Sequence, residues 1–233
     1  MGHRQDAQWF VQKEKMNSVT YNTDCLEAMR EMPDKAFDLA IVDPPYGIGH
    51  FTQSDRVDKY GDYKWNSAPP NAEYFIELTR VSKRRIIWGA NYYNCFEGEM
   101  GAIVWNKQNP HPSMSRCEIA SVSWGKRVGY FEYGYTNVIN YEDRFHPCQK
   151  PYALYHWTLT NYAKQGDTIL DTHLGSGSSR IAAYDLGFSF VGYELDTDYF
   201  NAQEERFARH IAQPQLFEIP RAEPIQEVMF AAA

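Results

Sequence analysis

The chain has 233 residues, 43% of them hydrophobic, and its acidic residues outnumber the basic ones to give a net charge of −7. This length allows one sizeable hydrophobic core, so a single domain is expected. The negative charge argues against a protein that coats nucleic acid non-specifically, although a global balance leaves room for local basic patches. The N-terminus is polar and no apolar run reaches roughly 18 residues, so neither secretion nor a membrane partner is expected.

Strand and helix signals alternate along the chain, which predicts a doubly wound α/β fold with a mostly parallel sheet. Strands are expected at 19–21, 37–42, 85–90, 102–107, 119–124, from 168, and at 188–195. Helices are expected at 25–32, 71–82, 152–163, after the glycine turn to 186, and at 197–210. The segment 125–145, rich in Gly, Tyr and Asn, is interpreted as a hairpin or loop.

These elements suggest one domain at 19–210, preceded by an extension at 1–18. The last residues, 211–233, contain three prolines and end in a run of alanines, so they are interpreted as a surface tail. Four cysteines, Cys25, Cys95, Cys117 and Cys148, show neither a C-x-x-C pair nor metal-ligand spacing. They are typical of free thiols in a reducing compartment, so a cytoplasmic location and no metal site are expected.

Two of the expected strands end in polar, turn-rich sequence, at Asp43 and at Asp171. In doubly wound sheets, ligands bind at such carboxyl ends. After Asp171, Gly175 and Gly177 allow a sharp turn into a helix whose free N–H groups can hold an anionic group. Glu194, at the end of the next strand, is spaced to accept hydrogen bonds from ribose hydroxyls.

This turn indicates a cofactor that contains a ribose. An ordinary strand-to-helix turn with an acidic strand end explains the glycines equally well when they are considered alone. The dinucleotide fingerprint G-x-G-x-x-G is incomplete, because Arg180 stands where its third glycine would be. The departure argues against NAD as the cofactor.

The segment DLAIVDPPYGIG (38–49) places an acid, two prolines and a tyrosine at the mouth of a hydrophobic strand. The lone pair of an exocyclic base amine is delocalised into the ring, so an enzyme that alkylates this amine must localise the pair. The Asp43 carboxylate and the Pro44 carbonyl supply two acceptors for its N–H bonds, and Tyr46 supplies a face on which an extruded base can stack. A turn that merely ends a strand would explain the prolines but not the acid and the tyrosine.

Three motifs resemble those of the β class of amino-group DNA methyltransferases, in which the catalytic motif precedes the cofactor motif. DPPYGIG (43–49) resembles the catalytic motif, and DTHLGSGSS (171–179) resembles the S-adenosylmethionine motif. HPCQKPYAL (146–154) is similar to the family's HP-T-QKP motif. The resemblance covers about 19–210. It implies a Rossmann-like methyltransferase fold with a small target-recognition insertion at about 108–145.

The resemblance also assigns roles to individual residues. The target base would be held by Asp43, Pro44, Pro45 and Tyr46. Asp43 would also border the cofactor. The resemblance places Asp24 near the adenine of the cofactor, Glu194 at its ribose, and Gln149 and Lys150 at its carboxylate. The residues implied around its methionine portion are Asp171, His173, Gly175, Ser176 and Gly177. A solvated surface lysine is an equally good interpretation of Lys150.

The chain departs from the family pattern at two positions. His173 stands where phenylalanine is commoner, and Cys148 stands where threonine is commoner. Neither change removes a catalytic group. No second His or Cys lies at ligand spacing from His173, so a packed or hydrogen-bonded histidine is expected there in preference to a metal ligand.

Basic residues near the implied recognition region are candidates for contacts with DNA. The segment 104–127 contains four basic residues and a single acidic residue, Glu118, so its net charge is +3. The loop 49–65 directly follows the catalytic motif, and its balanced charge favours a gate over the flipped base rather than an anchor. A further basic run at 80–85 fits a solvated helix end at least as well. The candidates for DNA contact are Arg56, Lys59, Lys64, Lys107, Arg116, Lys126 and Arg127.

The resemblance implies a site-specific enzyme that transfers a methyl group from S-adenosylmethionine to N6 of a flipped adenine in double-stranded DNA. The amine clamp fits adenine and cytosine alike, and the choice of adenine rests on the aspartate of the motif. Cytosine-N4 methylation and methylation of RNA or protein glutamine remain alternatives. The intact Asp43 and Tyr46 argue against a non-enzymatic DNA-binding module. The resemblance implies a bacterial or phage-encoded enzyme and leaves open a homodimer, a cognate restriction endonuclease and the recognition sequence.

Overall fold

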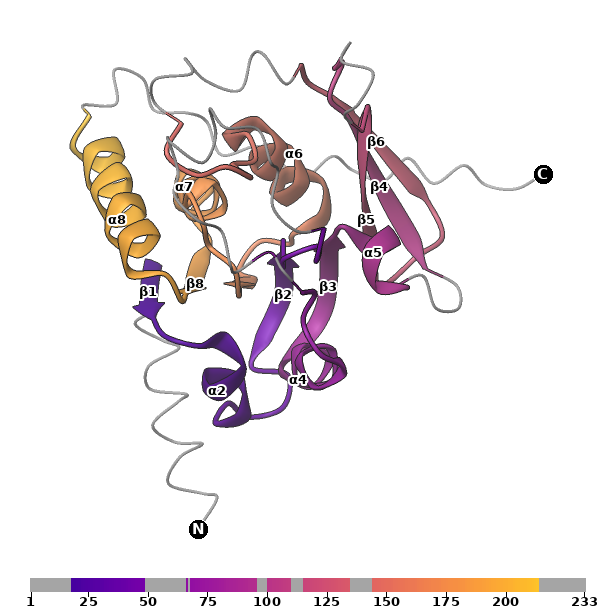
Figure 1. The fold of residues 1–233 in the computed structure, drawn as a ribbon, viewed down its shortest axis with the longest axis horizontal. Helices are drawn as coiled ribbons and strands as arrows, with labels where there is room; N and C mark the ends of the chain where they lie inside the picture. Colours follow the sequence, from indigo (N-terminus) through magenta and orange to yellow (C-terminus); the bar gives the residue numbers. More distant parts are fainter. Residues whose placement is uncertain are drawn as a thin grey trace.

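The computed structural model describes residues 18–48, 66, 68–95, 100–109, 115–134 and 144–213. Within them, the strands form one mixed sheet, and helices cover both of its faces (Figure 1). The predicted α/β fold class is therefore confirmed. The expected extension at 1–18 and tail at 211–233 fall almost wholly outside the described residues, as does the loop 49–65.

The sheet has the strand order β1-β8-β7-β2-β3-β5-β4-β6. The parallel part consists of β1 (Ser18–Asn22), β8 (Ser189–Glu194), β7 (Thr168–Asp171), β2 (Phe37–Val42) and β3 (Ser82–Trp88). An antiparallel strand, β5 (Cys117–Val122), follows β3 and also pairs antiparallel with β4 (Gly101–Asn106). The edge strand β6 (Val128–Glu132) runs parallel to β4. The carboxyl ends of all five parallel strands consequently lie at one edge of the sheet.

The helices are α2 (Cys25–Arg30), α4 (Ala72–Val81), α5 (Ala90–Tyr93), α6 (Tyr152–Tyr162), α7 (Ser178–Asp185) and α8 (Thr197–Ala212). Three of them begin at a side-chain cap, because Asp24, Asn71 and Asp196 accept hydrogen bonds from backbone N–H groups of the first turn. None of the described helices is both long and apolar enough to cross a membrane.

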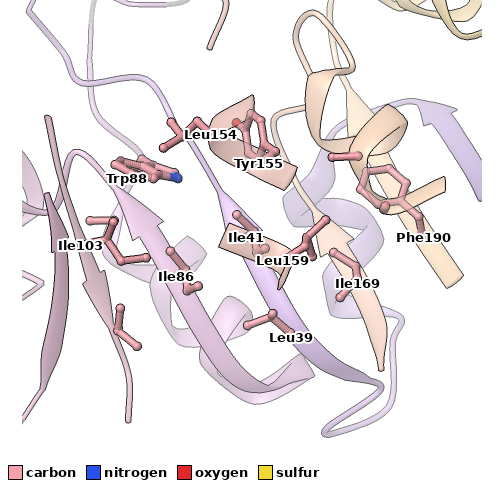
Figure 2. Packing of buried hydrophobic residues seen from close by; sticks show 14 of the residues in the cluster. Leu39, Ile41, Ile86, Trp88, Ile103, Leu154, Tyr155, Leu159, Ile169 and Phe190 are labelled. Carbon is pink, nitrogen blue, oxygen red and sulfur yellow. The ribbon is translucent and has the colours of Figure 1, made fainter. Parts of the chain in front are cut away.

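The sheet is buried on both faces, which explains the continuous apolar runs of its central strands. On one face, Leu39 and Ile41 of β2 pack with residues of α6 and α7, as Figure 2 shows for Leu154 and Leu159 of α6. On the other face, the remaining apolar residues of β2 pack with α2 and α4, for example against Leu78. Burial on both faces holds β2 rigidly, and with it the residues that follow β2.

Two elements differ from the sequence-based expectations. Strand β3 ends at Trp88 rather than at residue 90, because Gly89 adopts a left-handed φ of 73° and leads into α5. Strand β6 lies in the segment 125–145 that was expected to be a hairpin or loop. It is an edge strand without a fully buried residue, so its apolar signal is weak. Strands β5 and β6 make the described part of the region 108–145 continuous with the main sheet.

Candidate active site

A cavity of about 970 Å³ opens at the carboxyl edge of the parallel strands. The chain proceeds from β7 to β8 on one side and from β2 to β3 on the other, so the direction of winding reverses between β7 and β2. Such a reversal is where doubly wound sheets bind ligands. The volume lies at the upper end of the range for small-molecule sites, about 300–1,000 Å³. The predicted site residues that line it are Asp24, Asp43, Pro44, Pro45, Tyr46, Lys107, Lys150, His173, Gly175, Ser176 and Glu194.

The Asp43 carboxylate is engaged on both oxygens. Its Oδ1 accepts a hydrogen bond of 2.7 Å from the Tyr46 hydroxyl, and its Oδ2 forms an ion pair with Nζ of Lys150. Burial raises the pKa of Asp43, and the positive charge of Lys150 opposes this shift. The site thus holds a carboxylate acceptor directly after β2.

The Tyr46 ring is fixed by its neighbours on several sides. It stacks on Tyr92 with 4.8 Å between the ring centroids and meets Tyr93 edge-on at 6.1 Å. Its backbone N–H donates to Oδ1 of Asn66 over 3.0 Å. A Cβ added to Gly89 would lie 2.3 Å from Cε1 of the Tyr46 ring, so only glycine leaves room for the ring there. One face of the expected base-stacking ring is therefore already covered by Tyr92.

The Pro44 carbonyl, expected to be the second acceptor for the amine, accepts a hydrogen bond from the Tyr93 hydroxyl. The same hydroxyl lies 2.9 Å from the Pro45 carbonyl oxygen. A carbonyl oxygen has two lone pairs, so this contact leaves Pro44 with capacity for a further donor. Tyr93 thereby orients the backbone that carries the two prolines.

Lys150 lies at the centre of a buried charged cluster, which we define as Asp43, Lys107, Glu118 and Lys150. Its Nζ is 3.2 Å from Oε2 of Glu118 and 3.0 Å from the Tyr46 hydroxyl, besides the ion pair with Asp43. Burial would lower the pKa of Lys150, but Asp43 and Glu118 together raise it. The solvated surface lysine considered for this position is wrong, because its side chain is only 5% exposed.

The other end of the cavity contains Glu194 at the end of β8. Its Oε2 accepts the Gly175 N–H over 2.8 Å, and its Oε1 accepts the Asp196 N–H over 3.0 Å. Each carboxylate oxygen keeps a lone pair for a further donor. His146 of the HP-x-QKP segment packs edge-on against Tyr199, and a Cβ on Gly175 would lie 3.4 Å from its ring. This arrangement fits a bound ribose beside a glycine turn.

Several residues expected at the cofactor lie elsewhere or serve the turn itself. Asp171 is buried behind the turn, where it accepts hydrogen bonds from the His173 N–H and the Ser179 hydroxyl. Burial raises its pKa to about 7. Gly177 has a φ of 73° and faces Gln203 rather than the cavity. Gln149 is buried, does not line the cavity, and within the described residues its side chain has no hydrogen-bond partner.

Two other residues expected at the cofactor line the cavity with structural partners. Asp24 caps α2 through Leu26 N–H over 2.7 Å. His173 Nδ1 lies 3.0 Å from the Thr172 hydroxyl, and its ring packs against Tyr74. Burial lowers the pKa of His173 to about 4. His173 is thus a packed, hydrogen-bonded and neutral histidine, as expected. The described residues contain no group of three or more His, Cys, Asp or Glu side chains that could hold a metal ion.

The residues expected to contact DNA are dispersed. Lys107 is 8% exposed and pairs with Glu118 over 3.0 Å, which places it in the cavity wall rather than on the surface. Arg116 is exposed immediately before β5, near the cavity. Lys126 and Arg127 are exposed in the turn between β5 and β6, and the pairing of Ile86 with Val122 puts this turn at the opposite edge of the sheet. Arg56, Lys59 and Lys64 lie outside the described residues.

Sequence reasoning missed Glu118, Tyr92 and Tyr93 as parts of the site. In the sequence, Glu118 is the single acidic residue of a basic segment. This pattern fits a counter-ion for the neighbouring lysines, but only the direction of β5 shows that Glu118 lies at the cavity. The two tyrosines lie in α5, the short helix that follows β3, and the carboxyl end of β3 lies beside that of β2. Their position after the strand was a usable signal, because residues that follow parallel strands share one edge of the sheet.

Comparisons with known proteins agree with this geometry. The model of the N6/N4 methyltransferase family, described as DNA methylase, matches residues 104–205. The chain is 23% identical to the type II methyltransferase M.HinfI of Haemophilus influenzae over 90% of this chain and 74% of that protein. It superposes on the M1.HpyAVI–SAM complex with a TM-score of 0.52 and 22% identity, covering 80% of this chain and 98% of the other. For the cytosine-N4-specific PvuII DNA methyltransferase the TM-score is 0.59 with 12% identity, over 87% and 89% of the two chains.

These matches confirm the expected resemblance at the level of amino-group DNA methyltransferases, without a distinction between adenine N6 and cytosine N4. Residues 104–205 are similar to the N6/N4 DNA methyltransferase family, and the fold of the chain is that of the S-adenosylmethionine-dependent DNA methyltransferases.

Proposed function

We propose that this protein transfers a methyl group from S-adenosylmethionine to the exocyclic N6 amine of an adenine flipped out of double-stranded DNA. The observation that carries the proposal is the half-buried Asp43 carboxylate beside the Pro44 carbonyl, in one cavity with the Glu194 and Gly175 turn. The first pair offers acceptors to an amine, and the second offers acceptors and a close backbone to a ribose. Placing both in one cavity brings an amine and a ribose-containing cofactor together.

S-adenosylmethionine, when bound, supplies an electrophilic methyl group. Glu194 would hold its ribose, Asp24 would lie near its adenine, and Gly175 and Ser176 would line its methionine portion. Of the two residues expected at its carboxylate, Lys150 is committed to Asp43 and Gln149 does not line the cavity. Arg144, which was not expected there, lines the cavity and offers another cation. Burial, with Arg144 and Lys150, lowers the pKa of the adjoining His146 to about 3, so this imidazole is neutral at pH 7.

At the target base, Asp43 and the Pro44 carbonyl would accept the two N–H bonds of the amine, which directs its lone pair away from the ring. As the amine is alkylated its nitrogen gains positive charge, and the negative Asp43 stabilises that charge in a site largely shielded from water. Tyr46 would stack on the extruded base with its face that does not contact Tyr92. DNA contacts would come from Arg116 beside the cavity and from the loop 49–65.

The choice of adenine rests on the aspartate of DPPY, which resembles the adenine enzymes more than the cytosine-N4 enzymes. The fold itself does not separate the two, because the cytosine-N4-specific PvuII enzyme has the same fold. Both bases carry the required amine. A ring-carbon target is disfavoured, since such chemistry uses a cysteine thiolate as nucleophile. The sequence has no cysteine beside the DPPY motif, and desolvation raises the pKa of Cys148, which lines the same cavity, to about 11, so its thiol is protonated at pH 7.

We expect incubation with unmethylated DNA and isotopically labelled cofactor to produce labelled N6-methyladenine. The DNA would be digested to nucleosides and the labelled product identified by mass spectrometry. Label in N4-methylcytosine would refute the assignment of the base alone. Label in 5-methylcytosine, or only in RNA or protein offered in parallel, would refute the interpretation of the DPPY segment.

Gly89→Ala is expected to reduce methyl transfer strongly, because the added Cβ would displace the Tyr46 ring from its position over Asp43. The left-handed backbone would also cost about 1–3 kcal/mol of stability. Gly187→Ala is the matched control: Gly187 has a φ of 74°, and a Cβ there would have no neighbour within 4 Å. Urea unfolding should show a loss for Gly89→Ala at least as large as that for Gly187→Ala, whereas turnover should fall only for Gly89→Ala. Equal turnover in both variants would show that the Tyr46 position is not critical.

A further inference from the structure

Glu118 is a second carboxylate in the site, and the chemistry described so far gives it no role. It is the second residue of β5, whose first residues reach the cavity because β5 runs antiparallel to β3. Its Oε1 accepts a hydrogen bond of 3.0 Å from Lys107, and its Oε2 faces Lys150 and Tyr46. Glu118 therefore shares Lys150 and the Tyr46 hydroxyl with Asp43.

The two donors that occupy Asp43 are both within reach of Glu118. Nζ of Lys150, which is paired with Oδ2 of Asp43, lies 3.2 Å from Oε2 of Glu118. The Tyr46 hydroxyl is 2.7 Å from Oδ1 of Asp43 and 3.3 Å from the same Glu118 oxygen. Asp43 thus has the shorter contacts, and Glu118 offers a second, more distant acceptor to the same two donor groups.

A target amine shares Asp43 with the donors that are already bound to it. In the protein as described, Oδ1 accepts a hydrogen bond from Tyr46 and Oδ2 pairs with Lys150, so an amine at the second lone pair of either oxygen competes with one of these donors. A buried donor that loses its acceptor costs about 1–3 kcal/mol. Because the Tyr46 oxygen already lies near Oε2 of Glu118, rotation of the hydroxyl proton alone provides a new acceptor.

We propose that Glu118 is a positioning residue for methyl transfer: it takes over the Tyr46 hydroxyl and a share of Lys150 when the amine binds, and so leaves an oxygen of Asp43 for the amine. This inference rests on the proposed function. Glu118 touches neither the base nor the cofactor in this role and acts through Tyr46 and Lys150.

The charge state of Glu118 suits this role. Burial alone would raise its pKa, but the ammonium groups of Lys150 and Lys107 outweigh burial and lower the pKa to about 2. Glu118 is therefore an ionised acceptor throughout the neutral range. Lys107 fixes Oε1, which leaves Oε2 directed at Lys150 and Tyr46.

The test is the pH dependence of single-turnover methylation of DNA by the full-length Glu118→Gln variant. We expect the rate to fall roughly ten- to hundredfold, the equivalent of a lost buried hydrogen bond, while calorimetry shows unchanged affinity for S-adenosylmethionine. The acidic limb of the profile should move to lower pH. Burial and the charge of Glu118 both raise the pKa of Asp43, so removing that charge keeps Asp43 ionised to lower pH.

Two variants separate positioning from a merely structural role. Glu132→Gln removes an exposed carboxylate on β6 that does not line the cavity, and it should retain the wild-type rate and profile. Glu118→Asp keeps the charge but is shorter by one methylene group, so its rate should fall while its acidic limb stays in place. If both Glu118 variants have lower rates and the acidic limb of the pH profile does not move in Glu118→Gln, the role of Glu118 is structural and the proposal is overturned.

Other outcomes are equally decisive. A wild-type rate in Glu118→Gln overturns the role of Glu118 while leaving the proposed function intact. Absence of methyl transfer to DNA by the wild-type protein overturns the proposed function and this inference together. If Glu118→Gln does not fold, Glu118→Asp decides alone: a reduced rate with wild-type unfolding stability and wild-type affinity for S-adenosylmethionine supports the proposal, whereas a wild-type rate, or a loss of rate that accompanies a loss of stability or affinity, overturns it.

Discussion

Asp43→Asn is expected to reduce methyl transfer by about 10²–10³-fold, the usual effect of removing one preorganised electrostatic group. The substitution keeps the size of the side chain but replaces a carboxylate oxygen with an N–H donor, which would face the N–H bonds of the amine. Affinity for S-adenosylmethionine should be retained, because Glu194 and Gly175 hydrogen-bond to each other without Asp43. Single-turnover kinetics and calorimetry measure the two effects separately.

Asp34→Asn is the matched control for this substitution. Asp34 lies just before β2, at the opposite end of that strand from Asp43, and its side chain is 76% exposed in an ion pair with Arg80. This variant should methylate at the wild-type rate. If Asp43→Asn keeps a rate within tenfold of the wild type, the catalytic role must lie with another group.

The fold could be predicted where burial leaves a strong pattern. Strand β2 coincides with its expected range because both its faces are buried, which makes its sequence continuously apolar. Strand β6 was missed because it is an edge strand whose residues alternate between exposed and half-buried. An edge strand of this kind is stabilised by backbone pairing with β4, and backbone pairing leaves little trace in the side-chain sequence.

The candidate site could be predicted only as far as local motifs reach. The DPPY segment and the glycine turn each follow a strand, so their shared edge follows from the parallel sheet. The pairing of Lys150 with Asp43 and Glu118 depends on three segments far apart in the sequence. No spacing rule connects them. For the same reason, Lys107 was expected on the surface, although it pairs with Glu118 across adjacent strands.

Lys150→Met is expected to destabilise the protein by about 3–5 kcal/mol at pH 8, because it leaves a buried carboxylate without its partner. Glu118 keeps Lys107, so the loss falls mainly on Asp43. The exposed Lys83, which pairs with the half-buried Asp38, provides the control: Lys83→Met should cost about 0–1 kcal/mol, because Asp38 keeps its hydrogen bonds from Thr168. Urea unfolding measures both changes. A similar small loss in the two variants would show that the charged cluster contributes little to stability.

The pH dependence of the Lys150→Met variant follows from the sign of the Asp43 shift. Burial already raises the pKa of Asp43 and Lys150 opposes it, so the variant raises this pKa further above its unfolded value of about 3.9. The folded state then binds a proton more readily than the unfolded state, so the stability deficit is small at pH 4 and grows as the pH rises through the raised pKa. The acidic limb of methyl transfer should move to higher pH, opposite to its shift in Glu118→Gln. Shifts in the same direction in both variants would contradict an ionised Asp43 as the group that acts on the amine, because Lys150 and Glu118 carry opposite charges.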